Sequence, residues 1–84
     1  MSSHTLKVWP EEYAAVQSGK MNWSVRLNDR GIKVDDVIMF SEFEPQENRF
    51  TGRSILRKVT YIHDLGQYGK GLEGYIGMSL TSID

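Results

Sequence analysis

SILRKVTYIHDLGQYGKGLEGYIGMSLTSI, residues 54–83, contains two β-forming segments joined by a glycine-rich stretch. Residues 54–63 alternate, so that Val59 and Tyr61 are predicted to share one face of a strand. Residues 75–83 have a similar composition and predict the last strand. Residues 64–74 hold four of the eight glycines in the chain, a composition that predicts a mobile loop. This stretch therefore predicts a sheet built from neighbouring strands.

The segments before this stretch extend the same pattern. Residues 37–44 predict a long strand, and the polar residues 45–52 predict a turn. Residues 22–27 also alternate, and the pattern puts Trp23, Val25 and Leu27 on the apolar face, with Trp23 in the core. Residues 28–31, NDRG, are typical of a turn.

The N-terminal part predicts one more strand and one helix. Residues 4–9 alternate and are rich in β-formers. Pro10 and two acidic residues follow, which are favoured at a helix start, and Gly19 marks the end of that helix. We therefore expect one domain over residues 1–84, mostly β with one or two short helices. A small sheet of this kind curls into a barrel to remove its exposed edges, and the helix is expected to plug one opening.

Composition excludes several classes of protein. Hydrophobic residues make up 39% and charged residues 25% of the chain, as in ordinary folded domains. The net charge of −1 argues against a strongly basic nucleic-acid binder, and the absence of cysteine excludes disulfides and thiolate chemistry. No apolar stretch resembles a leader or a membrane span, so we expect a cytoplasmic protein without a membrane partner.

Motifs for catalysis and for metal binding are weak. His4, expected at a frayed terminus, and His63, at a strand end, are the two histidines, and no G-x-S-x-G or metal-ligand spacing accompanies them. The glycines of residues 64–74 lack the lysine and serine that complete a phosphate loop. The sequence thus predicts neither a metal nor a cofactor.

GKMNWSVRLNDRG, residues 19–31, is the most informative polar stretch. Asn22, Ser24 and Arg26 share one strand face, and the guanidinium of Arg26 suits a carboxylate, a phosphate or a base edge. Plainer interpretations remain open. Lys20 complements the helix dipole, Arg26 pairs with Glu42 or Glu44, and Asn28 and Asp29 form a turn. The four tyrosines, at positions 13, 61, 68 and 75, provide either stacking surface or packing.

The order of these motifs resembles the ASCH domains, in a small bacterial and phage branch of the PUA-like superfamily. The resemblance runs from about Leu6 to Leu80 through LKVWPEEYAAVQSGK, NWSVRLNDRG, TGRSILRKVTYI and GLEGYIGMSL. The residues that match the family pattern are Gly19, Lys20, Arg26, Asn28, Asp29, Arg30, Asp36, Gly52, Arg53, Gly74 and Tyr75. Asp35 replaces a glycine of the family, Met21 replaces its second lysine, and Ser24 replaces a glutamate.

The resemblance implies a PUA-like barrel with a cleft between helix and sheet that binds RNA or a nucleotide-like ligand without catalysis. The ligand-binding residues expected from it and from the polar stretch are Lys20, Asn22, Ser24, Arg26, Asn28, Arg30, Tyr13 and Tyr75. A second hypothesis is an amidohydrolase acting on N4-acetylcytidine, with Lys20, Ser24 and Glu73 as catalytic candidates. A third is a phage or accessory protein that binds a host protein.

Overall fold

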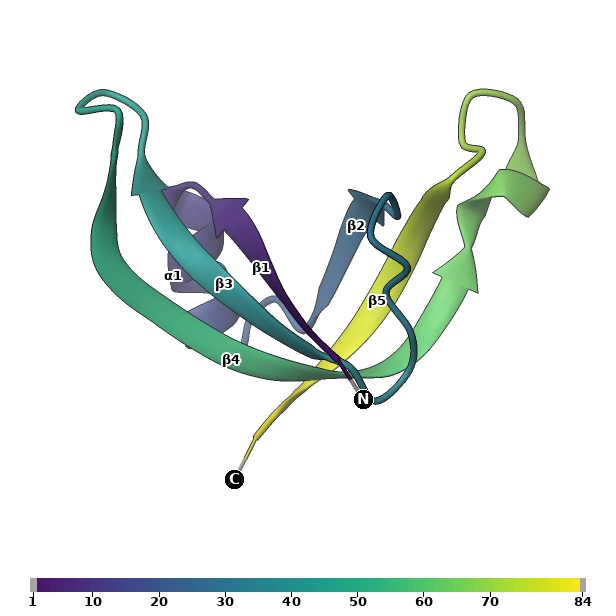
Figure 1. Cartoon of the computed structure of the whole chain (residues 1–84), viewed down its shortest axis with the longest axis horizontal. Coiled ribbons are helices and arrows are strands. Elements are labelled where there is room, and N and C mark those ends of the chain that lie inside the picture. Colours follow the sequence, from purple (N-terminus) through teal and green to yellow (C-terminus); the bar gives the residue numbers. More distant parts are fainter. Residues whose placement is uncertain (1, 84) are drawn as a thin grey trace.

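The computed structural model describes residues 2–83. One five-stranded sheet, in the order β1-β3-β4-β5-β2, curls into a half-barrel (Figure 1). The predicted five strands and helix are confirmed, and the loop after β4 contains an additional 3₁₀ helix. The elements are β1 (Ser3–Val8), α1 (Pro10–Gln17), β2 (Trp23–Leu27), β3 (Val37–Glu44), β4 (Arg49–Asp64), η1 (Leu65–Tyr68) and β5 (Tyr75–Ser82).

The long strand β4 joins the two arms of the half-barrel (Figure 1). Its first part pairs with β3 and its second part with β5, and Arg57 and Lys58 pair on both sides. The predicted turn over residues 45–52 is too long, because β4 already begins at Arg49 and pairs with the end of β3.

A β-bulge in β4 reverses the face that the alternation predicts for Tyr61. Val59 pairs with Leu80, whereas Tyr61 pairs with Ser79, so one extra residue stands between them on β4. Val59 is fully buried, while Tyr61 is 60% exposed on the outer face. The prediction that these two side chains share a face is therefore wrong.

Strands β1 and β2 are the two edges of the sheet and do not pair with each other. The predicted closure into a complete barrel is thus only partly realised. Two arginines span the opening between the edges. Arg30 donates a hydrogen bond to the carbonyl oxygen of Thr5 on β1, and Arg26 Nη2 on β2 lies 2.8 Å from Glu12 Oε2 on α1.

Helix α1 begins and ends as its sequence predicts. Pro10 occupies the first turn with Glu11 and Glu12, and Gly19 follows the helix with a φ of +81°, which glycine adopts without strain. Tyr13 and Val16 are buried, and the helix lies against β3. Gln17, the last residue of the helix, is exposed.

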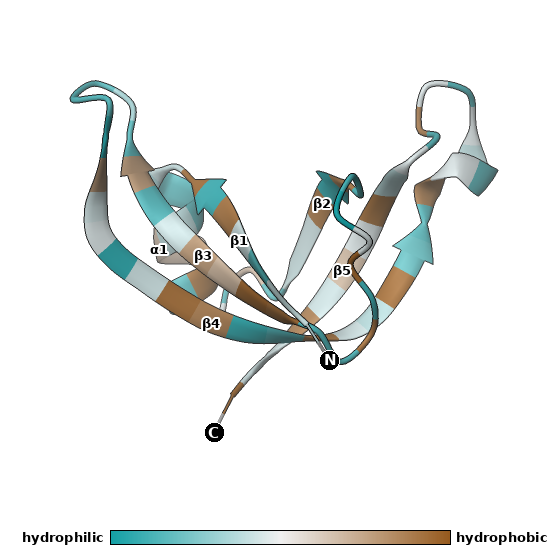
Figure 2. Cartoon of the chain, viewed as in Figure 1, coloured by the Kyte–Doolittle hydropathy of each residue, from teal (hydrophilic) through white to brown (hydrophobic). Residues whose placement is uncertain are grey.

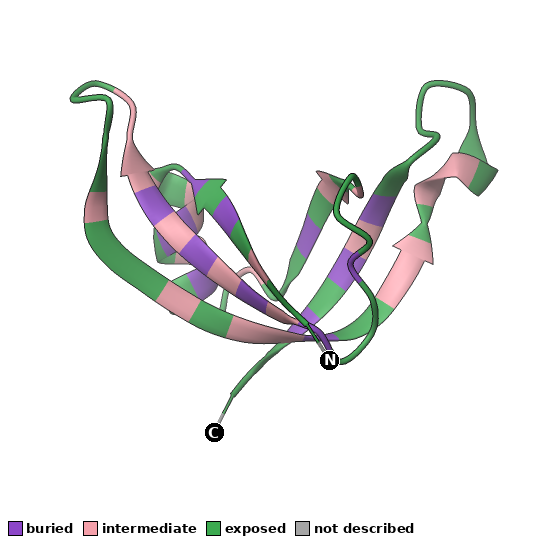
Figure 3. Ribbon diagram, in the orientation of Figure 1, coloured by how far each residue is buried: buried purple, intermediate pink, exposed green. Residues whose placement is uncertain are grey.

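Buried and exposed residues alternate along much of the sheet (Figure 3), as expected when one face of the sheet packs against the core. Hydropathy also varies along the strands (Figure 2), but Ser24 and Glu42 are polar and buried. The buried apolar residues are Leu6, Val8, Tyr13, Val16, Ile32, Ile38, Phe40, Val59, Ile76, Met78 and Leu80.

The prediction that Trp23 belongs to the core is wrong. Trp23 is 56% exposed, and Ser24 is the buried residue of β2. Ser24 pairs with Met78, whose side chain faces inward, so the register with β5 turns Ser24 to the core and the indole outward. Within residues 2–83, no helix is long and apolar enough to cross a membrane.

Candidate functional site

A buried carboxylate ties the two long strands together at a bulge. Glu42 is 1% exposed, and its carboxylate accepts hydrogen bonds from the Thr51 hydroxyl and, at two points, from the Arg53 guanidinium. Arg53 also lies over the ring of Tyr13, 5.1 Å from its centroid. The hydrogen bonds from Arg53 hold the pKa of Glu42 below its ordinary value. This network holds α1, β3 and β4 together, because Tyr13 lies on α1, Glu42 on β3, and Thr51 and Arg53 on β4.

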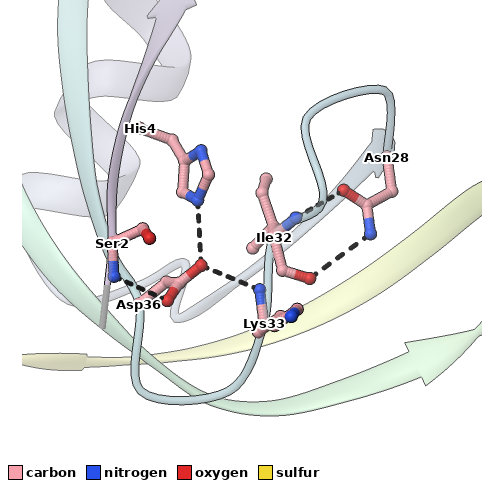
Figure 4. A network of polar contacts seen from close by, with 6 residues as sticks. All are labelled: Ser2, His4, Asn28, Ile32, Lys33 and Asp36. Atoms are coloured by element: carbon pink, nitrogen blue, oxygen red, sulfur yellow. Dashed lines mark hydrogen bonds and ion pairs between the residues drawn. The ribbon is translucent and has the colours of Figure 1, made fainter.

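A second acidic residue organises the loop between β2 and β3 (Figure 4). The Asp36 carboxylate accepts hydrogen bonds from the backbone N–H groups of Ser2 and Lys33 and contacts His4 Nε2 at 2.9 Å. The hydrogen bond from Ser2, followed by those from His4 and Lys33, lowers the pKa of Asp36 from 3.8 to about 2. His4 is therefore fixed by β1 and Asp36 and does not lie at a frayed end.

Three residues predicted to bind ligand already have partners within the chain. The Arg26 guanidinium pairs with Glu12, in place of the predicted Glu42 or Glu44. The Asn28 side chain accepts a hydrogen bond from the N–H of Ile32 and donates one to its carbonyl, so it shapes the irregular loop after β2, whose turn lies at residues 34–35 and not at the predicted 28–31 (Figure 4). Arg30 donates to Thr5.

Tyr13 and Tyr75, the two tyrosines predicted to bind ligand, differ in exposure and lie on different faces of the sheet. Tyr13 is buried and donates a hydrogen bond to the carbonyl of Ser54. Tyr75 pairs with Leu27, on the outer face of the sheet, and is 37% exposed. Tyr13 and Tyr75 therefore do not line one surface.

The three catalytic candidates are not assembled into a site. The Ser24 hydroxyl is buried, and no hydrogen-bond partner for it is found among the described residues. Lys20 is exposed before β2 begins, and Glu73 lies in the loop before β5, where it accepts from the N–H of Gly71. Because β2 and β5 are antiparallel, Lys20 and Glu73 lie beyond opposite ends of their ladder. The ladder is about 17 Å long, since each of its five residue pairs spans about 3.4 Å.

A polar hollow of about 220 Å³ lies where α1 ends against β5. It contains Asn22 from the predicted set and Arg57, which the sequence analysis did not select. Arg57 Nη2 lies 3.1 Å from the Val16 carbonyl at the end of α1, and Nη1 lies 2.9 Å from the Leu56 carbonyl. The full lining is Val16, Gly19, Met21, Asn22, Arg57, Leu80, Thr81 and Ser82.

A larger hollow, of about 420 Å³, lies on the outer face of β2, β5 and β4. Three of its side chains, Trp23, Tyr61 and Tyr68, are exposed aromatics. Sequence alternation missed this group, because the bulge before Tyr61 and the register of β2 depend on long-range pairing. The signal that was present in the sequence is a lone tryptophan, Trp23, in residues 22–27, together with Tyr61, His63 and Tyr68 within eight residues. The lining consists of Trp23, Tyr61, His63, Leu65, Tyr68, Gly77, Met78 and Ser79.

No metal centre is visible in the part of the chain that the structure describes, because no three of its histidine, aspartate and glutamate side chains gather closely enough to hold an ion.

Comparison with known proteins identifies the family. A search of curated proteins gave no match to the chain. The family model described as "Domain of unknown function (DUF3850)" matches residues 3–80, which include β1 to β4, both helices, β5 as far as Leu80 and the linings of both hollows up to that residue. The chain therefore belongs to the DUF3850 family.

Proposed function

We propose that the chain is a small binding module for RNA or a nucleotide-like ligand, and that a phosphate of this ligand lies in the polar hollow. The observation that carries the proposal is the fixed guanidinium of Arg57 in the wall of that hollow. A guanidinium has five N–H donors, and two of its nitrogens are held here by backbone carbonyls. The remaining donors are oriented before a ligand arrives.

The surroundings of Arg57 suit an anion. Asn22 brings an amide and Ser82 brings a hydroxyl, and both groups can donate hydrogen bonds to phosphate oxygens. The positive charge also offsets the partial negative charge of the carbonyls at the end of α1. A charged donor with neutral donors around it is the usual composition of a phosphate site.

The resemblance to ASCH domains supports the same ligand class. The half-barrel and its single helix fit a PUA-like fold, and the hollow lies between that helix and the sheet, where the resemblance implies a cleft. RNA and nucleotides are cytoplasmic ligands, in accord with the location expected from the sequence. Hydrolysis of N4-acetylcytidine is the weaker hypothesis, because Lys20 and Glu73 lie beyond opposite ends of the β2–β5 ladder.

Binding of a fluorescein-labelled hexauridylate at low salt, followed by anisotropy, tests the proposal. Arg57→Gln removes the charge, and the affinity should fall roughly 10- to 100-fold, the effect of losing a hydrogen bond to a charged group. Asn22→Ala, at an exposed position, should weaken binding without affecting the fold. Arg49→Gln is the matched control, since Arg49 is an exposed arginine whose partner is Glu47 in the β3–β4 turn.

Equal losses for Arg57→Gln and Arg49→Gln would show a non-specific charge effect and refute the phosphate site. Circular dichroism identifies any variant that fails to fold, and Asn22→Ala then decides the question.

A further inference from the structure

Trp23 and Tyr61 both pair with Ser79, from the two strands that flank β5. Their side chains line the outer hollow and are 56% and 60% exposed. We propose that the space between them is a slot for one planar heteroaromatic ring, the base of a nucleotide. This inference takes the class of ligand from the proposed function. It places the base of the ligand in the outer hollow, whereas the proposed function places a phosphate in the polar hollow.

The spacing of the strands suits one ring. Trp23 and Tyr61 are two strands apart, which corresponds to about 9.6 Å between their backbones. A ring stacked on both sides needs about 7 Å between the two flanking rings, since carbon atoms make their best contact at roughly 3.5 Å. The remaining width allows the two side chains to lean toward the ligand. An exposed aromatic pair at this spacing holds a base by stacking, whatever its sequence.

The floor of the slot has no side chain next to Ser79. Gly77 pairs with Val25 on one side and His63 on the other, and its missing side chain leaves the hollow open. A Cβ atom on Gly77 would meet the Cβ of His63 at 3.8 Å, an ordinary contact. Packing therefore permits a side chain at residue 77, so a substitution there can fill the floor of the hollow without disturbing the fold.

Polar groups stand at one end of the slot. The ring of His63 and the hydroxyl of Tyr68 share a hydrogen bond, and their ring centroids are 5.2 Å apart. Apolar walls with a few polar groups are typical of sites for small molecules, whose volumes range from roughly 300 to 1,000 Å³. The outer hollow, at about 420 Å³, falls within this range.

Positive charge near the slot favours a nucleotide over a neutral aromatic ligand. Lys58 pairs with Thr81, two residues beyond Ser79 on β5, and its Nζ lies 3.5 Å from Asp35 Oδ1. Both side chains of this ion pair are exposed, so the pair is weak and Lys58 is available to a phosphate. The polar hollow lies on the α1 side of β5 and the slot lies on the outer face, with Thr81 about 7 Å along the strand from Ser79.

Tryptophan fluorescence tests the slot directly, because the chain has two tryptophans of equal exposure. Trp9→Phe leaves Trp23 as the fluorophore, and Trp23→Phe leaves Trp9, which is 57% exposed beside α1. Each protein is titrated with adenosine 5′-monophosphate, adenosine, ribose 5-phosphate and hexaadenylate. We expect saturable quenching of Trp23 by the three ligands that contain a base, no quenching by ribose 5-phosphate, and no saturable change in Trp9.

Two further variants locate the ligand. Tyr61→Ala should weaken the binding of these ligands roughly 5- to 100-fold, the range for losing one stacked base. Gly77→Val fills the floor and should weaken it as well, while both tryptophans and the charge stay unchanged. A stronger response to hexaadenylate than to the mononucleotide identifies the ligand as a single strand, and the reverse identifies a free nucleotide.

The slot and the proposed function fail in different ways. If labelled hexauridylate binds and Arg57→Gln weakens it, but Trp23 fluorescence and Tyr61→Ala show no response to any base, the slot is refuted and the phosphate site stands. If Trp23 responds while Arg57→Gln binds as wild type does, the phosphate site is refuted and the slot stands. If no ligand in either series binds, both are refuted.

Discussion

Arg53 donates two hydrogen bonds to the buried carboxylate of Glu42, with Nε 2.7 Å from Oε1 and Nη2 2.8 Å from Oε2. The register between β3 and β4 shifts here. On β3 a single residue, Glu42, lies between the pairs Ser41–Ser54 and Phe43–Phe50, whereas on β4 residues 51–53 lie between them. The ion pair thus lies at this irregularity in the β3–β4 ladder.

Arg53→Ala should destabilise the fold strongly, because it leaves the carboxylate of Glu42 buried without its cation. Thermal unfolding followed by circular dichroism should show a loss of several degrees. Arg49→Ala, which removes an exposed partner of Glu47, should shift the midpoint little. Glu42→Leu combined with Arg53→Met should recover part of the loss, since apolar residues can replace a buried ion pair. Equal midpoints for Arg53→Ala and Arg49→Ala would contradict this account.

Asp36 predicts how the fold responds to acid. Its pKa is about 2 in the folded chain against an ordinary 3.8, so the unfolded chain binds the proton first as the pH falls. The stabilisation from Asp36 is therefore complete above 3.8 and is lost between 3.8 and about 2. Urea midpoints of wild type and Asp36→Asn should differ clearly at neutral pH and converge over this interval. A difference that stays constant down to the lowest pH would argue against the network around Asp36.

Two phenylalanines test where the core lies. Phe40 is fully buried on the inner face of β3, whereas Phe50, near the start of β4, is 53% exposed. Phe40→Ala should reduce the free energy of unfolding by about 3–5 kcal/mol, through lost burial and a cavity. Phe50→Ala should cost about 1 kcal/mol, since its main loss is the edge-to-face contact with Phe43. Similar urea midpoints for the two variants would contradict the inward-facing core.

Asp35 adopts a conformation that suits glycine, with a φ of +77°. Glycine adopts this conformation without strain, because it has no Cβ atom. Asp35→Gly should stabilise the fold by up to about 1 kcal/mol, because an L-residue is strained in the left-handed region. Asp35→Ala removes the carboxylate but keeps the strain, so it should be the less stable of the two in urea. The opposite order would rule out strain at this position.

Local sequence patterns predicted the elements well. The bounds of β3 agree with the prediction, and α1 starts at Pro10 and ends before Gly19, because strand alternation and helix ends depend on neighbouring residues. The faces of two strands were assigned wrongly. For Trp23 the register with β5 decides, and for Tyr61 a bulge decides, and both depend on pairing with distant residues.

The candidate site shows the same limit. Asn22 was selected from the alternation of residues 22–27, and it lies just before β2 among the residues that line the polar hollow. Arg57 comes from β4 and reaches the end of α1, a contact across 41 positions that no local motif marks. Arg26 was selected for its guanidinium, yet its partner Glu12 lies on the helix.

The ladder between β2 and β5 has a consequence for synthesis. Strands β3, β4 and β5 follow one another as hairpins, but β2 must wait for β5, which is translated after the other four strands of the sheet. Until then the backbone N–H and C=O groups of β2 have no ladder partner from β5. Emergence of residues 75–79 from the ribosome therefore completes the β2–β5 ladder, and any truncation before Tyr75 leaves β2 without its only ladder among the described residues.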